Sequence, residues 1–209
     1  MEILHKFLAK PVFSAFPEVI WKHPGAQKNL CLTFDDGPDP EITPAVLDIL
    51  KQFKVSALFF LQGEKLKQNR DLLKNINYQG HRLGNHGYHH VPLIMKSSEV
   101  LKYEIQGTDR LIEEHFGKRP VLFRPPYGIW GPGLRNQLKL MKKEMVLWSL
   151  MSNDFKWETE KVLLYLKNTV SGGDIIVFHD NQASQKTILQ VLPDFLEFCQ
   201  TNGFNFQLL

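Results

Sequence analysis

Five short polar segments stand out in this 209-residue sequence, because each comes where an apolar run ends and each carries side chains that can bind a metal or transfer a proton. They are Thr33–Gly37, His86–His90, Arg124–Gly128, Asn153–Phe155 and Phe178–Asp180. Adjacent carboxylates, two imidazoles four residues apart and an isolated histidine supply metal ligands, a general base and a general acid. These are the parts needed for metal-assisted hydrolysis of an amide.

Asp36, His86 and His90 are the candidate metal ligands. A catalytic zinc-type site needs three nitrogen or oxygen ligands and one open position for water or substrate. If residues 86–90 form a helical turn, the i to i+4 spacing brings both imidazoles to one side. Two surface histidines are the alternative, and His89 would point elsewhere. The neighbouring aspartate pair favours one divalent metal ion, with zinc as the default and cobalt, nickel, manganese or iron compatible.

Asp35 is the candidate general base. Two adjacent carboxylates in one turn repel each other, and a division into one ligand and one base explains both of them. Asp-Asp-Gly-Pro is also an ordinary turn sequence, so this assignment depends on the other segments. Arg124 is expected to hold Asp35 ionised through a bidentate contact, with a purely structural ion pair as the alternative.

His179 is the candidate general acid, because it ends an apolar strand and would hang over the same face as the carboxylates. A buried, hydrogen-bonded histidine is the alternative. Asp154 is predicted to orient His179 and raise its pKa, although Asp154 could equally cap the helix that begins near Glu158 or face the solvent. The prolines and glycine of the third segment brace a loop whose Tyr127 N–H could face an oxyanion.

The elements that must position these residues alternate between strands and helices. Strands are predicted at 30–34, 55–61, 82–85, 121–123, 145–150, 175–178 and 204–208, and helices at 43–53, 66–76, 97–115, 132–141, 158–170 and 185–201. Thr43 is expected to cap the first helix and Gly117 to end the third. This alternation predicts an α/β fold, a distorted or incomplete (β/α) barrel of about seven parallel strands, with a doubly wound open sheet as the competing architecture.

Composition is that of an ordinary globular protein, with 43% hydrophobic and 22% charged residues. The net charge of +3 is too small to suggest a nucleic-acid partner. Cys31 and Cys199 are far apart and predicted to be buried and inert. No apolar stretch reaches the roughly 18 to 20 residues of a membrane helix. We expect residues 1–28 to form an N-terminal arm packed on the barrel and residues 29–209 to form the domain.

The first 21 residues contain no continuous apolar region of the kind that a signal peptide needs. We therefore expect a cytoplasmic location, unless a leader has been trimmed from the sequence. The oligomeric state is not indicated by any pattern.

The five segments resemble the motifs of the polysaccharide deacetylase family, carbohydrate esterase family 4 with its NodB homology domain, from about Asn29 to the C-terminus. Thr-Phe-Asp-Asp-Gly is similar to the first motif, with Asp35 as base and Asp36 as metal ligand. His86 with His90 is similar to the second, Arg-Pro-Pro-Tyr-Gly to the third and Asn-Asp-Phe to the fourth. Phe-His-Asp is similar to the fifth, whose histidine is the general acid behind an apolar wall residue, here Phe178. All five occur in the family's order.

This resemblance implies a NodB-like distorted barrel that uses a divalent metal to remove N-acetyl, or sometimes O-acetyl, groups from chitin-like, peptidoglycan or xylan substrates. Tyr127, Phe155 and Phe178 would then contact the substrate. In this sequence Gly87 replaces the usual hydroxyl residue of the second motif, and we expect it to loosen the metal loop. Phe155 replaces the usual tryptophan, whose sugar-stacking surface Trp157 or Trp130 could supply, although a core role for either fits equally well.

Two other functions are compatible with the same residues. The first is a metal-dependent amidohydrolase for a small intracellular amide, imide or formamide, which suits the missing export signal better than a cell-wall substrate does. The second is a non-catalytic sugar- or metal-binding domain whose turnover was lost at Gly87.

Overall fold

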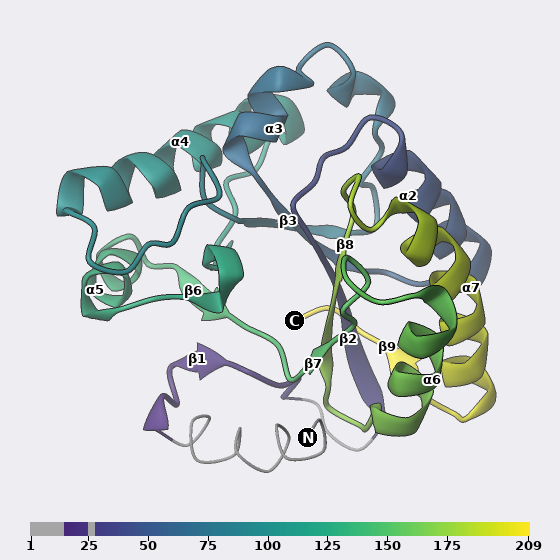
Figure 1. The fold of residues 1–209 in the computed structure, drawn as a ribbon. Helices are drawn as coiled ribbons and strands as arrows, with labels where there is room; N and C mark the ends of the chain where they lie inside the picture. The colour runs from purple at the N-terminus through teal and green to yellow at the C-terminus, as the bar shows by residue number, and fades with distance from the viewer. Residues whose placement is uncertain (1–14, 25–27) are drawn as a thin grey trace.

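The computed structural model describes residues 15–24 and 28–209, which form a curled sheet wrapped by helices (Figure 1). The strands are β1 (Val19–Ile20), β2 (Asn29–Asp35), β3 (Leu58–Leu61), β4 (Arg82–Asn85), β5 (Leu122–Phe123), β6 (Glu144–Val146), β7 (Leu150–Met151), β8 (Ile175–His179) and β9 (Asn205–Phe206). The helices are α2 (Ile42–Phe53), α3 (Gly63–Gln68), α4 (Ser98–Phe116), α5 (Pro132–Leu140), α6 (Thr159–Thr169) and α7 (Gln185–Thr201), with 3₁₀ turns η1 (Leu73–Asn75) and η2 (Pro126–Gly128).

The strand order is β1-β6-β5-β4-β3-β2-β8-β7, with β9 beside the start of β2, and all the named strand pairs in the described ranges are parallel. From β2 to β6 the sheet advances one strand at a time without reversing direction. β6 pairs with β5 near one end of the strand order, and β7 pairs with β8 at the other end. Only residues 147–149 separate β6 from β7, so the two ends of the sheet lie close together. The sheet therefore curls into a distorted (β/α) barrel as predicted, and the doubly wound alternative is wrong.

The predicted strand at 145–150 is divided in two, because β6 pairs with β5 while β7 pairs with β8. β1 adds a strand that the pattern did not indicate. It pairs with β6, and the next residues, Lys22 and His23, contact the start of β8 at Asp174 and Gly173. This part of the predicted N-terminal arm thus packs on the barrel. The rest of that arm falls on residues 1–14 and 25–27, outside the described residues.

Alternation along β2 separates the core from the site. Leu30, Leu32 and Phe34 face outward into a buried cluster that they share with residues of α2 and α7. Cys31 faces the barrel interior, where a second cluster contains Phe60 and residues of β5, β6 and β8. Thr33 and Asp35 therefore also point inward, and Asp35 lies at the carboxyl end. Figure 1 shows α2, α6 and α7 along one flank of the sheet and α3, α4 and α5 along another.

Both cysteines are buried free thiols, as predicted. Burial raises the pKa of Cys31 and of Cys199 to about 12, so neither thiol is ionised near neutral pH. No helix in the described part of the chain is long and apolar enough to span a membrane.

Two predicted helix boundaries differ from the structure. Thr43 does not cap the first helix, because the helix already begins at Ile42. Asp39 Oδ1 accepts hydrogen bonds from the backbone N–H groups of Glu41 and Ile42, both at 3.0 Å. The predicted helix at 66–76 is divided into α3 and η1. Gly117 does end α4, with φ of 74° and its N–H bonded to a carbonyl of the last turn.

Candidate active site

The predicted site residues lie at the carboxyl ends of the strands. Asp35 ends β2 and is in register with His179, which ends the neighbouring β8. His86 follows β4, Arg124 follows β5 and Asp154 follows β7. Because parallel strands present their carboxyl ends at one rim, residues distant in sequence meet there.

The turn that carries both aspartates is held by a residue to which the motifs assigned no role. Asp36 has a left-handed backbone, with φ of 77°. The next N–H, that of Gly37, donates to the buried Asp180 Oδ1 at 3.1 Å. A Cβ at position 37 would lie 2.2 Å from Asp180 Oδ2, so only glycine fits. Thr43 Oγ1 donates to the same carboxylate from α2. Asp180 thus fixes the position of the turn.

Asp36, His86 and His90 come together in three dimensions. Asp36 Oδ1 lies 3.0 Å from His90 Nε2 and 3.4 Å from His86 Nε2, and the three potential ligand atoms all lie within 4.8 Å of one another. Asp36 Oδ1 is buried and has no hydrogen-bond partner in the described residues. Burial alone would raise the pKa of Asp36. The two imidazoles lower it by more than burial raises it, so the pKa lies well below its usual value.

This donor set fits a divalent cation. Two ligand atoms about 2.0 to 2.1 Å from a shared tetrahedral zinc lie roughly 3.3 Å apart, close to the two distances from Asp36 Oδ1. A buried carboxylate oxygen without a hydrogen-bond donor is otherwise costly, and a cation would satisfy it. The two histidines and one carboxylate leave a coordination position free for water or substrate.

His86 is held in the tautomer that a metal ligand needs. Its Nδ1 lies 2.8 Å from the carbonyl oxygen of Arg124, to which it can only donate, so in the neutral ring the lone pair is on Nε2. The two imidazoles do not converge through a helical turn, as the spacing suggested. Residues 86–90 form an irregular loop in which Gly87 and His90 have left-handed backbones.

The expectation that Gly87 loosens this loop is not supported. Asn85 Oδ1 accepts from the Gly87 N–H at 2.8 Å. Glu104, buried on α4, accepts from the N–H groups of Tyr88 and His89 at 2.7 and 3.0 Å, and from the His89 ring at 2.7 Å. These contacts brace the loop without a hydroxyl at position 87. They also turn His89 away from the ligand set, as predicted.

Asp35 is buried and ion-paired, but not in the bidentate geometry that we expected. Arg124 Nη1 donates to Asp35 Oδ1 at 2.7 Å and to Thr33 Oγ1 at 2.7 Å. Nε and Nη2 donate to the carbonyls of Val146 and Leu147, so Arg124 contacts Asp35 through Nη1 alone. Burial lowers the pKa of Arg124, and the Asp35 carboxylate opposes this shift. Asp35 Oδ2 lies on the side of the candidate metal ligands, 3.9 Å from His86 Nε2.

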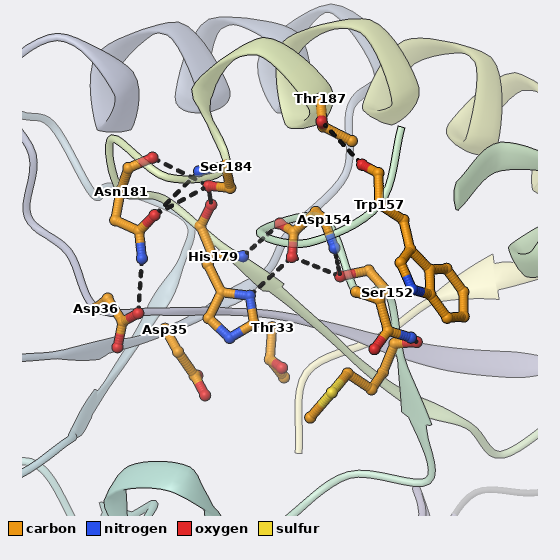
Figure 2. A network of polar contacts seen from close by, with 12 residues as sticks. Thr33, Asp35, Asp36, Ser152, Asp154, Trp157, His179, Asn181, Ser184 and Thr187 are labelled. Carbon is orange, nitrogen blue, oxygen red and sulfur yellow. Dashed lines mark hydrogen bonds and ion pairs between the residues drawn. The ribbon is translucent and has the colours of Figure 1, made fainter. Parts of the chain in front are cut away.

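His179 has the partner that the sequence suggested. Asp154 is buried, and its Oδ1 accepts from His179 Nδ1 at 2.8 Å while its Oδ2 accepts from the His179 backbone N–H (Figure 2). Ser152 also donates to this carboxylate. Burial lowers the pKa of His179, but the hydrogen bond and charge of Asp154 more than reverse this and raise it to about 9. The imidazole is therefore protonated at neutral pH, and Asp154 neither caps the next helix nor faces solvent.

Tyr127 lies beside a candidate metal ligand, with the centre of its ring 4.5 Å from that of the His90 ring. Its backbone is left-handed, with φ of 60°, and its N–H has no hydrogen-bond acceptor within the described ranges. The side chain is 58% exposed. Phe155 is 43% exposed, and its ring meets the His179 ring edge-on at 4.9 Å. Two exposed aromatic rings therefore flank the group of ligands and the candidate acid.

Phe178 is not a substrate-binding residue. Its ring is fully buried between the sheet and α7, 6.0 Å from Phe34 and 6.1 Å from Phe195. Neighbouring residues of a strand point to opposite faces, so the inward position of His179 forces Phe178 outward. Trp157 and Trp130 are partly buried, and each packs against a buried hydrophobic cluster.

Asn181 is a further contact that the motifs did not indicate. It lies two residues after His179, and its Nδ2 donates to Asp36 Oδ2 at 2.7 Å. Its position directly after the fifth polar segment was a signal that could have drawn attention to it. Glu104 gave another signal, because it occurs beside Ile105 on the apolar face of a predicted amphipathic helix.

Comparisons with known proteins agree with this barrel. The polysaccharide deacetylase family model matches residues 22–146. A peptidoglycan-N-acetylglucosamine deacetylase of Bacillus cereus is 32% identical over 191 residues, which cover 90% of this chain and 89% of that protein. The crystal structure of the Bc1960 peptidoglycan N-acetylglucosamine deacetylase has a TM-score of 0.85 and 30% identity, covering 93% of each chain. The chain belongs to the polysaccharide deacetylase family.

A third comparison limits what family membership implies. BA3943, a pseudoenzyme of carbohydrate esterase family 4 from Bacillus anthracis, has a TM-score of 0.80 and 25% identity, covering 90% of this chain and 66% of that one. A BA3943 mutant with restored enzymatic activity also has a TM-score of 0.80. Because this fold occurs with and without turnover, a conclusion about catalysis has to come from the side chains of the site.

Replacing Asp154 with asparagine should lower the pKa of His179 from about 9 towards its ordinary value, because burial is then opposed only by the charges of Asp35 and Asp36. NMR titration of the His179 ring in the metal-free protein measures this. The raised pKa contributes stability below pH 6.5 that is lost as the pH rises through about 9, so the variant should lose this dependence. Asp48→Asn, at an exposed position on α2, is the control. An unchanged His179 pKa in Asp154→Asn would contradict the assignment.

Phe178→Ala should lower the free energy of unfolding by about 3 to 5 kcal/mol, because it opens a cavity in a close-packed core. Phe155→Ala, which removes the same ring from an exposed position, should lower it by less than about 1 kcal/mol. Urea unfolding of both variants checks the pair. Equal effects would show that the burial of Phe178 has been misjudged.

Proposed function

We propose that this chain is a metal-dependent deacetylase that removes N-acetyl groups from an amino sugar of peptidoglycan or of a chitin-like chain. One observation carries the proposal. The Asp36, His86 and His90 ligand set shares one barrel rim with a buried aspartate that is paired to arginine and with a histidine that is protonated at neutral pH. A site that only bound a metal would not need the last two groups.

Asp36, His86 and His90 would hold one divalent cation, for which zinc is the first candidate because two imidazoles and a carboxylate are common zinc ligands. When bound, the cation polarises the acetyl carbonyl and makes water more acidic. Cobalt, nickel, manganese and iron have compatible ligand preferences, and their availability decides between them.

The residues of the chain supply the proton transfers. Asp35 accepts a proton from the water that attacks the acetyl carbon, and the hydrogen bond from Arg124 orients that carboxylate. The Tyr127 N–H donates to the oxyanion that forms on the carbonyl oxygen. His179, whose Nδ1 is held by Asp154, donates the proton on Nε2 to the leaving nitrogen as the C–N bond breaks. The products are acetate and a free amine.

A carbohydrate substrate is supported by the relatives, whose names describe peptidoglycan N-acetylglucosamine deacetylases. It is also supported by the two exposed rings, Tyr127 and Phe155, which lie on either side of the reacting groups. Aromatic rings beside a few fixed polar groups are typical of small-molecule sites. A non-catalytic role similar to that of BA3943 is disfavoured, because the base, the acid and all three ligands are present in this chain.

Acetate release tests the proposal. The metal-free protein should release no acetate from N-acetylated chito-oligosaccharides or peptidoglycan, and added zinc should restore turnover. Asp35→Asn and His179→Ala should each lower kcat by roughly 100-fold to 10,000-fold, the range for loss of a general base or acid. Asp48→Asn and His115→Ala, two substitutions of the same residue types outside the site, should leave kcat unchanged.

The outcomes separate the alternatives. Acetate or formate released from small amides but not from glycans would favour the small-amide hydrolase, and preference for acetylated xylan would favour O-deacetylation. Zinc binding without release from any substrate would indicate a binding domain. Full activity of Asp35→Asn or His179→Ala would remove the role assigned to that residue.

A further inference from the structure

Asn181 lies in the segment that joins β8 to α7 and reaches back to the metal ligands. Its Nδ2 donates to Asp36 Oδ2 at 2.7 Å (Figure 2). A donor this close to an ionised carboxylate forms a charge-assisted hydrogen bond, stronger than one between neutral groups. Asn181 is therefore a direct hydrogen-bond partner of a candidate metal ligand.

The orientation of the Asn181 amide is fixed by the protein. Its Oδ1 accepts from the backbone N–H of Ser184 at 3.1 Å, and a backbone N–H can only donate. The oxygen of the amide must therefore face α7 and the nitrogen must face Asp36. Ser184 is fully buried, and its hydroxyl also donates to the backbone carbonyls of His179 and Asn181. The segment that carries Asn181 is thus braced at both ends.

The two oxygens of Asp36 consequently have different environments. Oδ2 accepts from Asn181, whereas Oδ1 is buried, lacks a hydrogen-bond donor in the part of the chain that the structure describes and faces both His86 and His90. The left-handed backbone of Asp36 places the carboxylate at the rim, but the side chain could still rotate about χ2. The hydrogen bond from Asn181 opposes that rotation.

We propose that Asn181 is a positioning residue that holds Asp36 as a ligand through one oxygen, Oδ1, and so keeps the second oxygen away from the cation. This inference rests on the proposed function only in requiring that a divalent cation binds at Asp36. Partners of metal ligands typically change metal affinity by about 10-fold to 100-fold when they are removed. With Oδ2 occupied, a position on the cation stays free for water or the acetyl group.

Isothermal titration of the metal-free full chain with zinc tests the affinity. Asn181→Ala and Asn181→Leu both remove the donor, and leucine keeps a similar side-chain volume. We expect each to raise the zinc Kd by about 10-fold to 100-fold. Urea unfolding of the metal-free proteins should show that both variants stay folded, with stability lowered only by the lost acceptor of the Ser184 N–H. The second variant keeps the test valid if the first leaves a destabilising gap.

Gln182 provides a matched control. It is the adjacent residue in the same segment, and its Nε2 also donates to a carboxylate, Asp39 Oδ2, at 3.1 Å, but that carboxylate is not a candidate ligand. Gln182→Ala and Gln182→Leu should leave the zinc Kd within about two-fold. The visible absorption of the cobalt-loaded proteins gives a second readout, because its intensity falls as coordination number rises. It should fall in the Asn181 variants if Oδ2 becomes a ligand.

The possible results are distinct. Zinc binding by the parent chain with unchanged Kd and cobalt spectrum in both Asn181 variants would overturn the inference and leave the proposed function intact. Equal losses in the Asn181 and Gln182 variants would also overturn it, because they would show a general effect of the segment. No zinc binding by the parent chain would instead reject the metal site and with it the proposed function.

Discussion

The buried contact between Arg124 and Asp35 is the interaction on which the site depends. The guanidinium lies fully buried inside the barrel, against the Phe60 ring at 4.2 Å, and bonds to groups on β2, on β6 and on the residue after β6. Removing either charge would leave the other buried and unpaired, which typically costs about 3 to 5 kcal/mol. The backbone carbonyl of the same arginine fixes the His86 tautomer. One residue therefore positions both the candidate base and a candidate metal ligand.

The barrel makes this arrangement possible through strand register. Asp35 and His179 are paired positions on neighbouring parallel strands, so both point inward at the same height. Their flanking residues, Phe34 and Phe178, point outward and form part of the core under α7. The same alternation that gives the base and the acid a common face gives the helices an apolar surface to cover. The stability of the fold and the geometry of the site thus come from one period-two pattern.

Sequence alone predicted the barrel and the position of the five polar segments at the ends of strands. Both are local features, because an apolar run followed by polar residues can be recognised within a few positions. The prediction failed where tertiary contacts decide. Phe178 was predicted to bind substrate from its place in a motif, whereas strand alternation turns its ring into the core. The predicted bidentate contact of Arg124 with Asp35 is wrong because two backbone carbonyls also accept hydrogen bonds from the guanidinium. The role of Asn181 depends on Ser184 and on a turn about 145 residues earlier, and no local pattern encodes such a distance. Gly87 was expected to loosen its loop, but Glu104 braces that loop from a helix that comes later in the sequence.

Backbone strain explains why the remaining details resist local prediction. Seven described residues other than glycine have positive φ, and four of them, Asp36, His90, Tyr127 and Asn153, belong to the site segments. Each such conformation costs on the order of 1 kcal/mol or more for most side chains, so the surrounding structure must maintain it. Asp180 does so for the aspartate turn and Glu104 for the histidine loop. The candidate ligands converge because the buried side chains of Asp180 and Glu104 hold the backbone in conformations that the two segments would not adopt alone.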